Sequence, residues 1–115
     1  MPTREDVLRI RSIEEAFDLS TTKVRKHEVA LIRVAERERL IRLTEHAKEA
    51  AQDEGIAHEW IWRTIRHGKA RSKDCHEDFG RQIGLNLEAE ADGRRIIRVK
   101  VSWRARYFIA TVHTV

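Results

Sequence analysis

The chain has 115 residues, of which 41% are hydrophobic and 37% are charged, which fits one globular domain with a heavily charged surface. Five glycines and one proline are too few for a linker-rich or disordered chain, and no apolar run approaches the roughly 18 residues that a membrane span needs. The first ten residues lack the apolar core of a signal peptide and the single cysteine, Cys75, cannot form an internal disulfide, so we expect a cytoplasmic protein that does not associate with membranes.

Helical signals dominate the first part of the chain. A helix is predicted to begin at Thr3, with Asp6 three residues later as in a capping box, and to continue at helical spacing to Phe17. The segment DLSTT ends it. A second helix is predicted over residues 21 to 39, with apolar residues along one side and Lys, Arg and Glu along the other.

The third helix follows from the segment LTEHAKEAAQDEGI, residues 43 to 56. Thr44 can act as its N-cap, and Gly55 fits the left-handed residue that follows the last turn. His46 lies in the first turn, where the helix N-terminus disfavours a charged imidazole. A neutral imidazole can act as a base, while the alternative is a histidine that only fixes the start of the helix through a local hydrogen bond. A fourth helix is predicted over residues 57 to 67, ended by Gly68.

From residue 69 the period of the hydrophobic pattern becomes two. Residues 82 to 90 and 95 to 103 alternate as half-buried strands, and a three-residue loop Ala91-Asp92-Gly93 keeps the apolar residues on one face. This register places Leu87 opposite Ile97, and Gly93 takes the position that needs a positive φ. Residues 107 to 115 form a last strand, and residues 69 to 76 a weaker edge strand.

These elements predict an α+β fold in which helices come first and a three- or four-stranded antiparallel meander follows. Residues 1–40 would form a helical N-terminal extension packed on or beside a domain formed by residues 41–115. Residues 41 to 43, just before the third helix, are expected to run beside the sheet.

One face of this sheet is expected to carry polar and basic side chains. Six basic residues and no acidic residue lie between positions 94 and 106. Such a stripe favours a polyanion such as nucleic acid, although a solvated sheet face has the same composition. The polar residues that the alternation gathers on this face are Asn86, Arg98, Lys100, Tyr107, Thr111 and His113.

Histidine, arginine, lysine and tyrosine on one face suit the cleavage of RNA without a metal ion. That reaction needs a base for the 2′-hydroxyl, cations for the phosphorane charge and an acid for the leaving oxygen. The candidate catalytic residues are His46, Arg98, Tyr107 and Thr111. The candidate nucleic-acid-binding residues are Arg94, Lys100, Arg104, Arg106 and His113. No spacing typical of a metal site occurs, and no cofactor motif is present.

The segment LTEHAKEAAQDEGIAHEWIWRTIRHG, with the C-terminal FIATVHTV, resembles a small bacterial domain family of unknown function. Its members read Thr-x-His-Ala on a helix, then Gly-Ile, a helix ending in Gly, a sheet and a terminal Thr-Val, and the family in turn resembles the RelE-like toxins of toxin–antitoxin pairs. The resemblance covers residues 41 to 115. It implies an RNA-binding or RNA-cleaving toxin, RNA as a partner and a cognate antitoxin-like protein. Members often carry Arg one turn after the histidine, where this chain has Ala50.

Two other functions fit parts of the sequence. The segment AFDLSTTKVRKHEVAL resembles the turn and second helix of a helix-turn-helix, in which Lys23, Arg25 and Lys26 would approach DNA phosphates. Glu14, however, stands where that motif has a small apolar residue. The other alternative is a protein-interaction module without catalysis.

Overall fold

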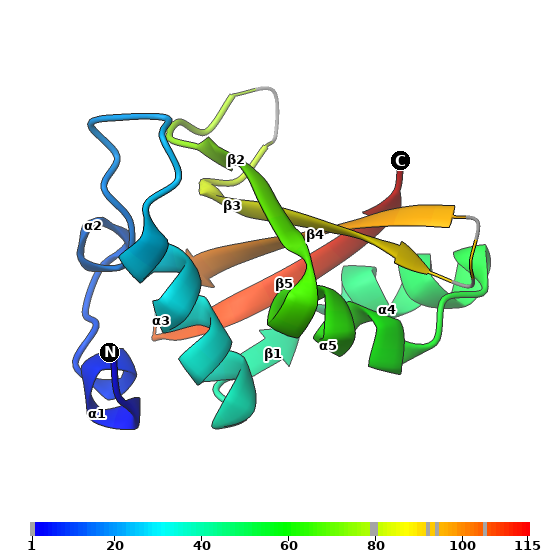
Figure 1. The fold of residues 1–115 in the computed structure, drawn as a ribbon, viewed down its shortest axis with the longest axis horizontal. Helices are drawn as coiled ribbons and strands as arrows, with labels where there is room; N and C mark the ends of the chain where they lie inside the picture. The colour runs from blue at the N-terminus through cyan, green and yellow to red at the C-terminus, as the bar shows by residue number, and fades with distance from the viewer. Residues whose placement is uncertain (1, 79–80, 92, 94, 105) are drawn as a thin grey trace.

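The computed structural model describes residues 2–78, 81–91, 93, 95–104 and 106–115. The chain has an α+β fold, drawn in Figure 1. Its described elements, in chain order, are α1 (Arg4–Leu8), α2 (Ile13–Ala16), α3 (Lys26–Arg37), β1 (Ile41–Leu43), α4 (Glu45–Glu54), α5 (His58–His67), β2 (Lys69–Asp74), β3 (Gly84–Ala91), β4 (Arg95–Arg104) and β5 (Tyr107–Thr114).

Within the described ranges the strands form one five-stranded sheet in the order β1-β5-β4-β3-β2. The four strands from β2 to β5 are an antiparallel meander, and β1 pairs in parallel with β5. The sheet is therefore mixed, and the expectation of three or four antiparallel strands omitted β1. Three residues are too few to show a hydrophobic period. The expectation that residues 41 to 43 run beside the sheet is nevertheless confirmed, since Ile41 pairs with Phe108.

The β3–β4 hairpin has the predicted faces but not the predicted register. Leu87 lies opposite Val99, and Ile97 lies opposite Ala89, so the pairing is shifted by two residues. Ala91 is fully buried and pairs with Arg95, so β3 extends one residue beyond the predicted strand. Gly93 has a φ of 72°, as predicted. A two-residue shift keeps every side chain on the same face, so alternation alone cannot exclude it.

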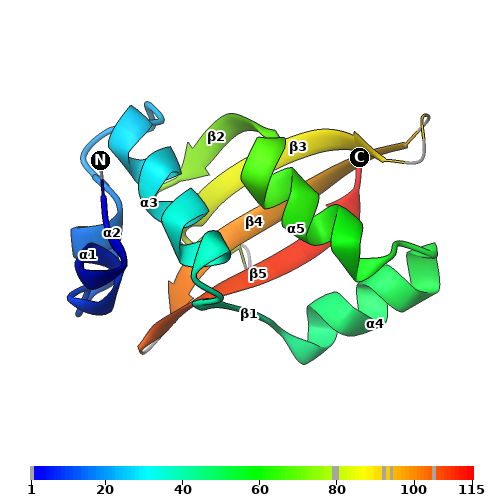
Figure 2. The same cartoon turned by 60° about the horizontal axis from the view of Figure 1, so that its bottom comes forward.

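Helices α3 and α5 lie across one face of the sheet, and α4 lies beside its β1–β5 edge (Figure 2). One hydrophobic core joins these layers, and it also includes residues from the first 40 positions. Phe17, for example, meets the ring of Phe108 edge-on at 6.2 Å. The segment that contains α1 and α2 is thus packed against the same core as the sheet.

The N-terminal helices are shorter than the sequence indicates. The helix predicted from Thr3 to Phe17 is split into α1 and α2, and the second predicted helix begins only at Lys26. Helices α4 and α5 match their predictions closely. Thr44 accepts a hydrogen bond from the Ala47 amide at 2.9 Å, and Gly55 is left-handed with a φ of 66°. Across the described residues, no helix is both long enough and apolar enough to cross a bilayer.

Candidate functional site

A pocket of about 430 Å³ is lined by Lys100, Thr111 and His113, and the strand neighbours of Lys100, Val99 and Val101, are buried in the core. Strands β4 and β5 form its floor, the start of α4 forms one wall, and the segment before β3 forms another. Its described lining contains two imidazoles, three cationic side chains and two hydroxyls, with no Asp or Glu. The lining residues are Thr44, His46, Arg81, Gln82, Lys100, Arg104, Thr111, Val112 and His113.

The short strand β1 places His46 at this pocket. The Thr44 amide donates to the Ala110 carbonyl at 3.4 Å, so the parallel pairing with β5 continues to the first residue of the α4 cap. The Thr44 hydroxyl then starts the helix through the Ala47 amide. His46 follows in the first turn with an exposed side chain at the edge of the pocket.

Lys100 fixes a second wall of the pocket. Its ammonium donates to Asp74 Oδ2 at 2.8 Å and to the Gln82 carbonyl oxygen at 2.9 Å. Burial opposes the charge on Asp74, but hydrogen bonds from Lys100 and Asn86 outweigh it and lower the pKa of that carboxyl group. Lys100 therefore holds residues 81–82 over the sheet, and this brings Arg81 to the pocket.

His113 is held in its neutral form by its surroundings. Partial burial in the pocket is the largest cause of its lowered pKa, followed by the positive charges of Arg98 and Lys100, while Glu88 acts in the opposite direction. Arg98 lies directly opposite His113 in the β4–β5 pairing. An imidazole with a lowered pKa remains unprotonated at neutral pH and can accept a proton.

The structure brings five of the nine predicted site residues into this pocket. They are His46, Lys100, Arg104, Thr111 and His113. Thr44, Arg81, Gln82 and Val112 complete the described lining and were not predicted as site residues. Arg81 and Gln82 precede β3 in a segment with no regular period, so only the contact from Lys100 reveals their place.

The remaining predicted residues lie outside the lining. Arg98 donates to the Glu88 carboxylate at 2.8 Å, and Tyr107 stacks under the guanidinium of Arg42, 4.1 Å from the ring centre. Arg106 is exposed between β4 and β5. Arg94 falls outside the described residues. The positions of Arg98 and Tyr107 on the predicted face agree with the alternation, but their side chains are engaged elsewhere.

Ala50 lines a smaller adjoining cavity of about 350 Å³ together with His46 and His113. This is the position at which the resemblance suggested by the sequence would lead us to expect an arginine in place of Ala50. Its methyl side chain leaves that cavity without the cation which an arginine would bring. In the described portion of the chain, no three His, Cys, Asp or Glu side chains are grouped so that they could share a metal ion.

The helix-turn-helix interpretation receives little geometric support. The element before the turn, α2, has four residues, and Glu28 of the following helix is buried in the core. Arg25 is paired with Asp18 at 3.1 Å, whereas Lys26 is exposed. A recognition helix needs a free face at its N-terminal end, and α3 presents only part of one.

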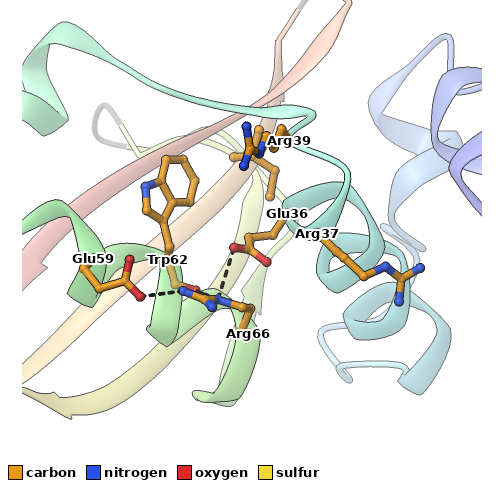
Figure 3. A pocket seen from close by; sticks show the side chains of 7 residues that line it. Glu36, Arg37, Arg39, Glu59, Trp62 and Arg66 are labelled. Carbon is orange, nitrogen blue, oxygen red and sulfur yellow. Dashed lines mark hydrogen bonds and ion pairs between the residues drawn. The ribbon is translucent and has the colours of Figure 1, made fainter.

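A larger cavity, of about 580 Å³, lies between α3 and α5 and contains none of the predicted site residues (Figure 3). Its lining is considered separately below. In comparisons with protein-family models, with curated proteins and with solved structures, no family, protein or structure matches this chain.

Proposed function

We propose that this protein binds RNA in the pocket between α4 and the sheet and cleaves it there without a metal ion, as an endoribonuclease of the RelE type. The observation that carries the proposal is the combination of His46 and His113 with three cationic side chains in one lining that has no described carboxylate. This is the set of groups that cleavage by internal attack of a 2′-hydroxyl requires.

Binding would rest on the cations of the pocket. Arg81 and Arg104 have no hydrogen bond or ion pair from their side chains to any described residue, and Arg104 and Arg106 stand together at the β4–β5 end of the face. Such arginines can contact phosphate oxygens bidentately. Lys100 is engaged by Asp74, so its role is to hold the wall and to add positive potential.

Cleavage would use the two imidazoles in turn. His113, with its lowered pKa, accepts the proton of the ribose 2′-hydroxyl. The 2′-oxygen bonds to phosphorus, the bond from phosphorus to the 5′-oxygen breaks, and His46 acts as the general acid that gives a proton to that leaving oxygen. The products are a 2′,3′-cyclic phosphate and a 5′-hydroxyl. Arg81 and Arg104 stabilise the charge that develops on the phosphorane.

This assignment differs from the sequence-based one in two respects. The sequence pointed to His46 as the base, whereas the surroundings of His113 favour that residue for the role. Arg98, predicted to hold the phosphate, is better placed to depress the pKa of His113 from the opposite position on β4. Thr111 stays in the site as a hydroxyl donor, and Tyr107, whose ring stacks with Arg42, lies outside the pocket.

The resemblance of residues 41 to 115 to a family that itself resembles RelE-like toxins supports the same activity, and it adds a cognate antitoxin-like partner to the proposal. The missing arginine at Ala50 argues for weaker phosphate contacts beside His46. We therefore expect slow cleavage rather than loss of RNA binding.

The test is an RNA cleavage assay on the purified chain with matched variants. The expected result is cleavage by the wild type, loss of cleavage in His113→Ala and His46→Ala, and wild-type activity in His58→Ala, a control with an exposed histidine in the first turn of α5. A substrate with a single 2′-deoxynucleotide at the cleaved bond should resist. Absence of cleavage by the wild type, or equal loss in the His58 variant, would contradict the proposal.

A further inference from the structure

The cavity between α3 and α5 has a lining unlike that of the first pocket. Its residues are Glu36, Arg37, Arg39, Ile41, Glu59, Trp62 and Arg66. In Figure 3 the Glu36 carboxylate and the Trp62 indole face the same space, and the guanidinium of Arg37 points away from it. The volume of about 580 Å³ is within the range of small-molecule sites.

Arg39 occupies a backbone position that favours glycine. The Leu40 amide donates to the Ala35 carbonyl at 2.7 Å and the Arg39 amide to the Glu36 carbonyl at 3.0 Å, which is a Schellman ending for α3. Arg39 has a φ of 59°, and it is the non-glycine residue with a positive φ in the described chain. The same ending after α4 is made by Gly55. Strain of this kind accumulates at functional sites.

The Arg39 side chain is exposed and makes no hydrogen bond or ion pair with any described residue. Its guanidinium therefore forms no interaction within the described structure that would offset the free-energy cost of the positive φ. A cation held at the rim of a cavity without a partner is suited to an anionic group of a ligand.

Glu36 supplies an acceptor without a partner. Its Oε1 forms an ion pair with Arg66 Nε at 3.2 Å, while Oε2 is buried and has no hydrogen-bond partner among the described residues. The side chain is 11% exposed. Burial raises the pKa of Glu36, Arg66 opposes this, and Glu59 adds to it. Because a buried acceptor without a donor is unfavourable, a ligand that brings N–H donors would be stabilised here.

Trp62 completes the set with a half-buried indole ring. A flat aromatic group can stack on it, as nucleobases do on tryptophan in nucleic-acid-binding proteins. Among its described lining residues, the cavity thus offers the planar surface of Trp62, the buried acceptor of Glu36 and the exposed cation of Arg39.

We propose that this cavity binds a guanine mononucleotide. Guanine presents two adjacent donors, N1–H and the N2 amine, to the carboxylate of Glu36, its ring stacks on Trp62, and its phosphate pairs with Arg39. Adenine has an acceptor at N1, which would face a carboxylate oxygen of Glu36 and be repelled by it. The inference is independent of the RNA site, because the described linings of the two pockets share no residue.

The test is an NMR titration of the full chain, in which each of the three tryptophans carries one indole N–H that can be followed. The probes are GMP, AMP and inorganic phosphate. We expect GMP to shift the Trp62 signal and to bind about tenfold more tightly than AMP or phosphate. Glu36→Gln should weaken GMP binding by about tenfold and leave phosphate binding unchanged.

Two further variants keep the outcome interpretable. Arg39→Gly should weaken both GMP and phosphate without lowering the melting temperature, because glycine fits the left-handed backbone there. Glu14→Gln, on the exposed side of α2, is the matched control and should bind GMP as the wild type does. Equal affinity for GMP, AMP and phosphate, no shift at Trp62, or loss of GMP binding in His46→Ala would overturn the proposal.

Discussion

Lys73 of β2 donates to both carboxylate oxygens of Glu28 of α3, at 2.9 and 3.1 Å, and both side chains are fully buried. The same carboxylate accepts the backbone amides of Asp18 and Arg25 at 2.7 Å, and Lys73 also donates to the Asp18 carbonyl. This network joins the start of α3 and the preceding loop to the sheet, so the first 40 residues are held by more than apolar contacts.

Lys73→Met is expected to lower the free energy of unfolding by about 3–5 kcal/mol, because it leaves the Glu28 carboxylate buried without its counter-charge. The double variant Glu28→Gln, Lys73→Met should recover part of this loss, since no net charge remains buried. Urea denaturation measures both. Lys48→Met, which breaks an exposed pair with Glu45, is the control and should change stability by less than about 0.5 kcal/mol. Equal effects of Lys73→Met and Lys48→Met would contradict this account.

Arg39→Gly should raise the free energy of unfolding by about 0.5–1 kcal/mol, because it removes the steric strain of a side chain at a φ of 59°. Gly55→Ala, at the equivalent end of α4, should lower it by about 1 kcal/mol. An added Cβ at Gly55 meets no atom within 4 Å, so the change reports backbone strain alone. Thermal or urea unfolding checks both. A destabilising Arg39→Gly would mean that the arginine contributes to the fold.

The sequence was most informative where a structural signal is local. Thr44 and Gly55 mark the two ends of α4 through hydrogen bonds to their neighbours in the chain, and both were predicted. The core faces of β3, β4 and β5 were also predicted, because their alternating apolar residues, such as Leu87, Val99 and Phe108, are the buried ones. The register was not, since only the position of the loop distinguishes pairings that differ by two residues.

Contacts between distant segments could not be predicted. The pairing of Glu28 with Lys73 joins residues 45 positions apart, and Lys73 lies in a segment whose charges suggested an exposed edge strand. The place of Arg81 depends on Lys100 in the same way. The candidate site was therefore predicted as a face, with His46 added from its place in the first turn of the helix after residues 41 to 43, and the pocket itself required the structure.

RNA binding should weaken steeply as salt concentration rises, because cations that replace counterions on phosphates dominate the affinity. Arg104→Ala should reduce the slope of log affinity against log salt by about 1, and Arg81→Ala should do the same. Arg9→Ala, at the exposed end of α1, is the matched control and should leave the slope unchanged. Fluorescence anisotropy with a labelled single-stranded RNA at several salt concentrations measures it. A slope that Arg104→Ala does not change would show that the RNA phosphates do not contact Arg104.

The rate of cleavage should stay at its maximum down to a lower pH than it would if the base were a histidine with an unshifted pKa. The pKa of His113 is lowered from 6.5, first by burial and then by Arg98 and Lys100, so the acid limb of the pH–rate profile should lie below pH 6.5. Arg98→Gln removes one positive charge and should move that limb upward toward 6.5. Single-turnover cleavage from pH 4.5 to 8 measures the limb, with Arg9→Ala as the control. A limb that Arg98→Gln does not move would contradict the assignment of His113 as the base.

The same lowered pKa should affect stability with a defined sign. The unfolded chain takes up the proton at a higher pH than folded His113, so stability falls as pH decreases from 6.5 through the lower folded pKa. Above pH 6.5 the residue makes no pH-dependent contribution. Urea denaturation at pH 7.5 and pH 5 measures the free energy of unfolding at both values. The difference between them should be smaller for His113→Gln than for the wild type. An unchanged difference between the two pH values would show that His113 is not desolvated.

The most direct test of the RNA site follows the six histidines of the chain by NMR during titration with single-stranded RNA and, separately, with duplex DNA. The RNA carries 2′-O-methyl groups, which block attack by the 2′-oxygen and so prevent cleavage during the measurement. The account predicts that RNA shifts the imidazole signals of His46 and His113, which line the pocket, and leaves those of His27 on α3 and His58 on α5 unchanged. Shifts at His27 with duplex DNA, and none at His46 or His113 with RNA, would contradict it and favour the DNA-binding alternative.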